Sequence, residues 1–290
     1  MARNKRTGRG PGKKRVALAT GLALVLLAAL IAGMAAVLGE LRLQRQAAAA
    51  GISRFSRDIP RNPYAAEHFS MENGRAAYED ESCRTETGID VSVHQGVIDW
   101  QAVAGDGIDF AVIQAGYRGY SDGGLGEDEQ FRANLEGARA AGIPTGVYFF
   151  SQAVNEAEAR DEAEFVLSLL DGTALDLPVF YDWERIESDT ARTEQVDGDT
   201  VTACAAAFCE TIEAGGYDAG VYFNQNYVYT FVDRSKLLNW PLWLAQYQSA
   251  PDFFYDFSYW QYTDSGSVAG ISAPVDLSLR FLPKDNSDGS

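Results

Sequence analysis

The sequence predicts an α/β protein whose main domain is a TIM-like (β/α)5β3 barrel, preceded by an N-terminal transmembrane helix and a stalk. From residue 88 onward, short β-rich runs alternate with stretches of helical length, which favours parallel strands joined by right-handed crossovers. Eight such runs within about 205 residues are too compact for an eightfold barrel, which typically needs roughly 250 residues. Five βα units followed by three nearly bare strands fit this length. An uncharged segment of 24 residues near the N-terminus predicts the membrane helix.

Each of the eight runs is short and rich in apolar residues. The predicted strands are Gly88–Val93, Ile108–Ala115, Ile143–Phe150, Leu177–Glu184, Ala219–Asn224, Leu242–Tyr247, Phe257–Tyr262 and Ala273–Leu277.

Helix signals separate the earlier strands. The segment Glu127–Ala141 places its apolar residues on one side and ends before a Gly-Ile-Pro sequence. Asn155 is the expected N-cap of a helix over Glu156–Leu170, and Asp199 is the expected cap of a helix that ends at Gly215. After residue 247 no helical stretch is expected, so the last strands should follow one another closely.

Charge divides the chain into four predicted segments. Residues 1–15 carry seven Lys or Arg and no acid, which predicts a cytoplasmic tail. Residues 16–39 are the signal-anchor helix, and residues 40–85, whose apolar periodicity is lost after Gly51, are an extracellular stalk. Residues 86–290 form the predicted barrel, with ten basic and 34 acidic residues.

The strong acidity of the main domain disfavours nucleic acid as a partner, because such binding depends on Lys and Arg neutralising phosphates. The N-terminal segment predicts a single-pass membrane protein with its N-terminus in the cytoplasm and the barrel outside the cell. Gly33-Met34-Ala35 offers a signal-peptidase site, and if it is cleaved the domain is secreted.

The chain has three cysteines and two histidines, which limits the disulfides and metal sites that it could form. Cys204 and Cys209 are five residues apart on an expected helix, too far for easy bridging, so either Cys83 pairs with one of them or the thiols are buried and free. No Cys or His spacing resembles a zinc site, and neither metal nor cofactor is expected.

The sequence Tyr181-Asp182-Trp183-Glu184 points to the chemistry. Side chains alternate along a strand, so Asp182 and Glu184 should face the same way, with Cα atoms roughly 6.5–7 Å apart. Neighbouring carboxyl groups repel each other, and the pKa of one should rise. A protonated acid beside an ionised partner is the arrangement that cleaves glycosidic bonds.

Two further carboxyl groups are expected at the same place. Active sites of α/β barrels lie at the C-terminal ends of the strands. Asp90 lies in the first strand and Asp276 near the end of the last predicted strand. We therefore expect Asp90, Asp182, Glu184 and Asp276 to converge on one mouth of the barrel.

Eight short motifs in order resemble glycoside hydrolase family 25, the Chalaropsis-type lysozymes. They begin with Gly88-Ile-Asp-Val-Ser92 and continue through Gly142-Ile-Pro-Thr-Gly-Val-Tyr148 and Tyr181-Asp-Trp-Glu184. The remaining motifs are Ile98-Asp-Trp100, Gly220-Val-Tyr-Phe-Asn224, Trp243-Leu-Ala-Gln-Tyr247, Trp260-Gln-Tyr262 and Val275-Asp-Leu277. The resemblance covers about residues 86–283, and each acidic position of the motifs is kept.

The resemblance implies an N-acetylmuramidase: hydrolysis of the β-1,4 bond between N-acetylmuramic acid and N-acetylglucosamine in peptidoglycan, with net retention. It assigns the general acid and base to Glu184. Asp182 would position the substrate's N-acetyl oxygen, stabilise an oxocarbenium-like transition state or act as nucleophile. Asp90 and Asp276 would hold the pKa values of these groups apart. The implied role is remodelling or catabolism of the cell wall.

Aromatic side chains at strand ends are the expected sugar platforms, because sugar rings present apolar faces. The predicted substrate-binding residues are Tyr148, Tyr222, Trp260, Tyr117, Gln246 and Trp243. His94 is expected in a loop or behind the site.

Two alternatives remain at this point. A barrel without activity that only binds glycan would share the fold, but both acidic residues of the D-x-E motif are present. Another N-acetylhexosamine-specific glycosidase is the second alternative. A chitinase-like enzyme would need a further Asp at the position of Phe180.

Overall fold

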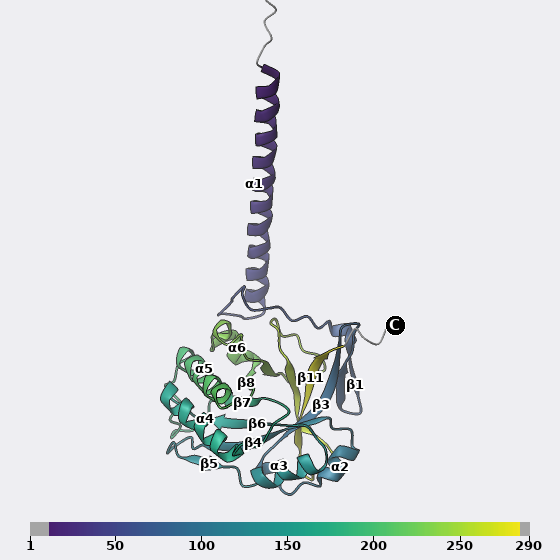
Figure 1. Ribbon diagram of the computed structural model, residues 1–290, viewed down its shortest axis with the longest axis vertical. Helices are drawn as coiled ribbons and strands as arrows, with labels where there is room; N and C mark the ends of the chain where they lie inside the picture. Colours follow the sequence, from purple (N-terminus) through teal and green to yellow (C-terminus); the bar gives the residue numbers. More distant parts are fainter. Residues whose placement is uncertain (1–11, 285–290) are drawn as a thin grey trace, which may run out of the picture. The chain divides into compact units, whose positions relative to one another are not determined.

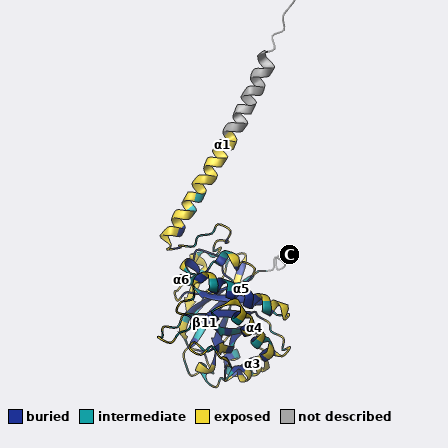
Figure 2. Cartoon of the chain, turned by 90° about the vertical axis from the view of Figure 1, so that its left-hand side faces the viewer, coloured by how far each residue is buried: buried dark blue, intermediate teal, exposed yellow. Residues whose placement is uncertain are grey.

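The computed structural model describes residues 12–284, with side chains from residue 28 onward. The chain divides into two units, residues 1–53 and 54–290. The first contains α1 (Gly12–Ala49), whose described side chains are mostly exposed (Figure 2). Across residues 28–284 no helix has the length and apolar character needed to cross a membrane. Residues 16–27, half of the predicted span, lie outside the described side chains.

The second unit is a closed barrel of eight strands, as predicted (Figure 1). The order around it is β3-β11-β10-β9-β8-β7-β6-β4, and pairing of β4 with β3 closes the sheet. The strands are β3 (Cys83–Val91), β4 (Phe110–Arg118), β6 (Thr145–Ser151), β7 (Val179–Trp183), β8 (Ala219–Asn224), β9 (Leu242–Ala245), β10 (Tyr259–Gly266) and β11 (Val275–Pro283). The short β5 (Leu125–Glu127) pairs with the end of β4.

Five α-helices connect the first six barrel strands, which confirms the expected βα units. They are α2 (Trp100–Gly105), α3 (Phe131–Ala140), α4 (Glu156–Leu170), α5 (Gly198–Ala214) and α6 (Gln225–Thr230), with 3-10 turns at Ala66–His68, Val93–Gln95 and Arg234–Lys236. Asn155 caps α4 as predicted, through the Glu158 N–H. The cap of α5 is Asp197 instead of Asp199, because Asp197 has the extended backbone of a cap and accepts the Thr200 N–H.

One strand runs against the expected direction. β11 is antiparallel to both of its neighbours, whereas the other seven barrel strands are mutually parallel. Asp276 is therefore near the start of its strand, not near the end. Because β11 is reversed, its start lies at the same mouth as the C-terminal ends of the other strands.

The barrel interior has an apolar layer below this mouth. A cluster of buried side chains fills it: Phe110, Val112, Leu177, Phe180, Tyr222, Trp243, Ala245 and Tyr259. On the outer face of β7, the Tyr181 ring lies 5.3 Å from that of Phe208 in α5, and the Trp183 ring stacks on Phe231. Each such buried large apolar side chain contributes about 1.5–3 kcal/mol. Phe180 and Asp182 therefore face inward, as the alternation of β7 predicted.

Residues 54–85 differ from the predicted stalk, because they pack on the barrel and belong to its compact unit. Ile59 is buried, and the Tyr64 ring stacks on Phe281 of β11 at 4.0 Å. The strands β1 (Phe69–Glu72) and β2 (Arg75–Tyr78) form a hairpin. Extended segments without helical periodicity can still bury aromatic rings, so the boundary lies near residue 54 and not at 86.

The three cysteines are buried and free, so neither disulfide considered from the sequence is formed.

Candidate active site

A cavity of about 480 Å³ opens at the C-terminal ends of the parallel strands. It is lined by Asp90, Val93, His94, Gln114, Tyr117, Asp128, Tyr148, Phe150, Asp182, Glu184, Tyr222, Trp243, Gln261 and Asp276. All four predicted carboxyl groups are among them. Within the part of the chain that the structure describes, no Lys or Arg lines this cavity, so its carboxyl groups face one another without a strong cation.

Asp182 and Glu184 share the inner face of β7 and its extension. Asp182 is buried, and its Oδ1 has no hydrogen-bond partner among the described residues. Burial raises the pKa of Asp182 well above its usual range, and the negative charge of Glu184 raises it further. Glu184 lies one residue beyond the strand and is half-buried. Burial raises the pKa of Glu184, although a hydrogen bond from Tyr222 partly offsets this.

Asp90 and Asp276 face each other across the β3–β11 ladder, where they are directly paired. Opposite side chains in an antiparallel pair have Cβ atoms about 4.5–5.5 Å apart, and like charges there are destabilising. Burial raises the pKa of Asp90 strongly, with Asp276 as the next cause. Gln261 of β10 donates to the Asp90 carboxyl at 3.0 Å and to that of Asp276 at 3.4 Å.

Gln261 also connects this pair to the aromatic side chains. Its Oε1 accepts hydrogen bonds from the hydroxyls of Tyr222 at 2.9 Å and Tyr247 at 3.0 Å. The single hydroxyl proton of Tyr222 can thus serve either Gln261 or Glu184. Burial raises the pKa values of Asp90 and Glu184, and the hydrogen bonds from Gln261 and Tyr222 partly offset this. A carboxyl group with a raised pKa is what a general acid requires.

The predicted sugar platforms are brought together only in part. Tyr148, Tyr222 and Trp243 line the depth of the cavity, and the half-exposed Tyr117 stands at its rim. Trp260 and Gln246 lie outside it. Because side chains alternate along β10, the inward position of Gln261 turns Trp260 outward, where it packs on Phe69.

Gln246 turns away for a local reason. Its side-chain amide donates to Asp252, and its backbone carbonyl accepts the indole N–H of Trp260. Neither Gln246 nor Trp260 is therefore placed to contact a ligand in the cavity.

Gln261 and Asp128 are among the cavity residues that the sequence reasoning missed. Asp128 is buried and accepts the Val93 N–H at 2.9 Å, which fixes the loop after β3. The sequence did contain an indication for Gln261, because it lies between two aromatic residues in a predicted strand. A buried amide there needs polar partners, and the carboxyl groups expected at the barrel mouth could provide them. His94, expected in a loop, lines the cavity from the 3-10 turn after β3.

In residues 28–284, no group of three or more His, Cys, Asp and Glu side chains is arranged to hold a metal ion.

Comparison with known proteins decides the family. The sequence profile of glycosyl hydrolases family 25 matches residues 89–271, well over half of the chain. The chain belongs to this family. The matched region contains Asp90, Asp182, Glu184 and Gln261, and it ends before Asp276.

The relatives of this chain include two lysozymes. The autolytic lysozyme of Clostridium acetobutylicum is 29% identical over 191 residues, covering 66% of this chain and 54% of that protein. Lysozyme M1 of Streptomyces globisporus is 29% identical over 199 residues, covering 65% of each. This chain thus spans about half to two thirds of the length of these relatives.

Among solved structures, the modular autolysin LytC of Streptococcus pneumoniae, determined with a synthetic peptidoglycan ligand, superposes with a TM-score of 0.63. It is 26% identical, and the match covers 74% of this chain and 52% of LytC.

Proposed function

We propose that this family 25 domain is an N-acetylmuramidase that hydrolyses the β-1,4 bond between N-acetylmuramic acid and N-acetylglucosamine in peptidoglycan. The observation that carries the proposal is the pair Asp182 and Glu184, which face one way into the cavity and whose pKa values are both raised by burial. The lysozymes and the autolysin to which the chain is similar support peptidoglycan as the substrate.

Glu184 is the proposed acid and base. Its carboxyl group donates a proton to the bridging oxygen while the bond from that oxygen to the anomeric carbon of N-acetylmuramic acid breaks. The resulting carboxylate then takes a proton from the incoming water, whose oxygen bonds to the same carbon. The anomeric configuration is retained, and Glu184 returns to its protonated state.

Asp182 is proposed to support this step from the same side of the sugar, by orienting the N-acetyl group or stabilising the positive charge of the transition state. Its place two residues before Glu184 on one strand face does not suit attack from the opposite side of the ring. A pH–rate profile of Asp182→Asn tests this role. We expect a reduced maximum with the Glu184-dependent limb retained. Loss of the whole profile would favour a nucleophile.

The test of the activity is digestion of purified peptidoglycan by residues 54–290, the compact unit, with the full-length chain in parallel. Mass spectrometry of the fragments should find reducing N-acetylmuramic acid ends. Reducing N-acetylglucosamine ends would indicate a glucosaminidase instead. Binding without cleavage would indicate a glycan-binding barrel.

We also propose that residues 16–39 anchor the chain in the cell membrane, with the N-terminus in the cytoplasm and the barrel outside. The uncharged length of the segment and the seven basic residues before it support this. A tethered enzyme reaches only the wall above its own membrane, which suits remodelling. Fractionation of cells expressing the full chain should place it in the membrane, whereas release into the medium would indicate cleavage.

A further inference from the structure

The peptide group that follows Glu184 is held at both of its edges by side chains. The Glu184 carbonyl oxygen accepts a hydrogen bond from the side-chain amide of Gln152 at 2.7 Å. The N–H of the same peptide, from Arg185, donates to the Tyr227 hydroxyl at 3.0 Å. Because a peptide group is planar and rigid, two bonds at opposite edges fix its rotation. No strand ladder does this, since β7 ends at Trp183.

Gln152 is itself fixed on all sides. Its side chain is buried, and its amide nitrogen donates to the carbonyls of Ser151 and Glu184. Its Oε1 accepts the Thr193 hydroxyl at 3.1 Å, so each polar atom of the amide is used. This bonding pattern also determines which amide atom is nitrogen, because two carbonyls face one side and a hydroxyl faces the other.

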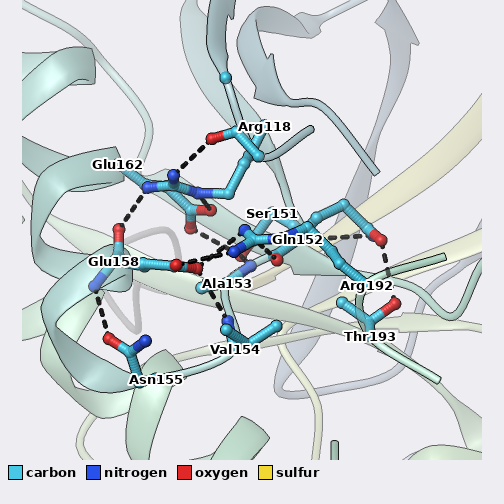
Figure 3. A network of polar contacts seen from close by, with 12 residues as sticks. Arg118, Ser151, Gln152, Ala153, Val154, Asn155, Glu158, Glu162, Arg192 and Thr193 are labelled. Carbon is cyan, nitrogen blue, oxygen red and sulfur yellow. Dashed lines mark hydrogen bonds and ion pairs between the residues drawn. The ribbon is translucent and has the colours of Figure 1, made fainter. Parts of the chain in front are cut away.

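The backbone of Gln152 is held by an ion pair (Figure 3). Arg192 donates to the Gln152 carbonyl at 3.2 Å and binds both oxygens of Glu158, at 2.7 and 2.8 Å. Glu158 in turn accepts the Val154 N–H at 3.1 Å. The segment after β6 is thus tied to α4 and to the loop after β7, and Gln152 has little freedom to follow a shift of Glu184.

Tyr227 is fixed by packing. Its ring lies 5.9 Å from that of Trp183 and 5.5 Å from that of Phe231, both measured between ring centroids. Neither Tyr227 nor Gln152 lines the cavity. Their contact is with the backbone of the proposed acid and not with any ligand.

We propose that Gln152 and Tyr227 are positioning residues, which together clamp the Glu184–Arg185 peptide and so set the direction of the Glu184 carboxyl group. This inference rests on the proposed function, since it assigns Glu184 as the acid. A carboxyl group displaced by about 1 Å from its productive position can cost on the order of 100-fold in rate. The clamp provides that precision at a place where the strand has already ended.

The experiment compares Tyr227→Phe, Gln152→Met and the double variant with the wild-type chain, on soluble peptidoglycan glycan fragments. We expect kcat to fall about 10-fold in Tyr227→Phe and about 100-fold in Gln152→Met, with KM within about twofold. Both hydrogen bonds hold the same planar peptide group. The fold decrease in kcat of the double variant should therefore be smaller than the product of the decreases in the two single variants. The Glu184-dependent limb of the pH profile of kcat should also shift, which a loss of stability alone would not cause.

Tyr229→Phe is the matched control. It lies on the same helix, and its hydroxyl accepts the Phe254 N–H at 2.7 Å, a bond of the same kind away from Glu184. It should leave kcat unchanged. Unchanged kcat in both clamp variants, an equal fall in the control, or losses that multiply in the double variant would each overturn the clamp. Wild-type protein that releases no reducing N-acetylmuramic acid would instead contradict the proposed function, and with it the role of Glu184.

Discussion

Two groups of buried carboxyl groups lie in this barrel, and they differ in their counterions. At the mouth, Asp90 and Asp182 are buried beside other acids, and no Lys or Arg lines the cavity within the described residues. In α4, Glu162 is also buried, but it contacts the Arg118 guanidinium at 2.7 Å and accepts the Ser151 hydroxyl at 2.6 Å. Figure 3 shows this second group.

The difference separates a chemical role from a structural one. Burial raises the pKa of Glu162 to about 7 even with Arg118 beside it. The mouth carboxyl groups lack such a partner, so burial and mutual repulsion act on them with less compensation. Uncompensated buried acids are costly to the fold, and they are useful where a proton must be given away near neutral pH.

The largest expected effect is on activity, in Glu184→Gln. The amide keeps the shape of the side chain but cannot donate a proton to the leaving oxygen. We expect kcat to fall by about 10²- to 10⁴-fold, measured as release of reducing N-acetylmuramic acid. The thermal midpoint should not fall, because burial disfavours the ionised form of Glu184 and the amide carries no charge. Retained activity would exclude Glu184 as the acid.

The next effect is on stability, in Arg118→Met. This change leaves Glu162 buried without its cation, and the carbonyls of Gly123 and Glu158 lose a donor. We expect a loss of about 3–5 kcal/mol in the free energy of unfolding, measured with denaturant. Without Arg118 the pKa of Glu162 in the folded state rises further, so more stability is lost as pH rises. The loss should be larger at pH 8 than at pH 5, and the opposite trend would contradict the structural role.

Removing an acid from the mouth should stabilise the fold. The pKa of Asp90 is raised in the folded state, so its protonated form favours folding at low pH, and this contribution is lost as pH rises. The free energy of unfolding of Asp90→Asn should therefore be about 1 kcal/mol higher than that of the wild-type chain at pH 7. It should be unchanged below about pH 4, where free Asp is itself protonated. Denaturant titrations at both pH values test this. A variant that is destabilised at pH 7 would indicate that Asp90 is held as a stable carboxylate.

The smallest effect is expected for Arg160→Met, the matched control for Arg118→Met. Arg160 lies in α4, the helix that also carries Glu162, and it pairs with Glu156 at 2.9 Å. Unlike Arg118 and Glu162, both of these side chains are about half exposed, at 47% and 53%. Exposed helical pairs contribute about 0.3–0.5 kcal/mol, so the free energy of unfolding should change by no more than this. A loss as large as that of Arg118→Met would mean that burial is not what distinguishes the two pairs.

Much of the site could be predicted because its signals are local. The period of two along β7 placed Asp182 and Glu184 on one face, and the Asn155 cap set the start of α4 where the structure has it. The same alternation could not choose a face for β10. Trp260 and Gln261 are adjacent, and only the polar partners at the mouth select Gln261 for the inside.

The sequence by itself determined the eight strands, the three longer helices between them and the mouth at which the acids cluster, since these depend on apolar periodicity, capping and chain length. Only the tertiary structure decided the reversed direction of β11, which sets Asp276 against Asp90. It also decided the packing of residues 54–85 and the clamp on the peptide after Glu184. These features join segments that are far apart in the chain. Their strand pairing and burial depend on long-range contacts, which local sequence patterns do not encode.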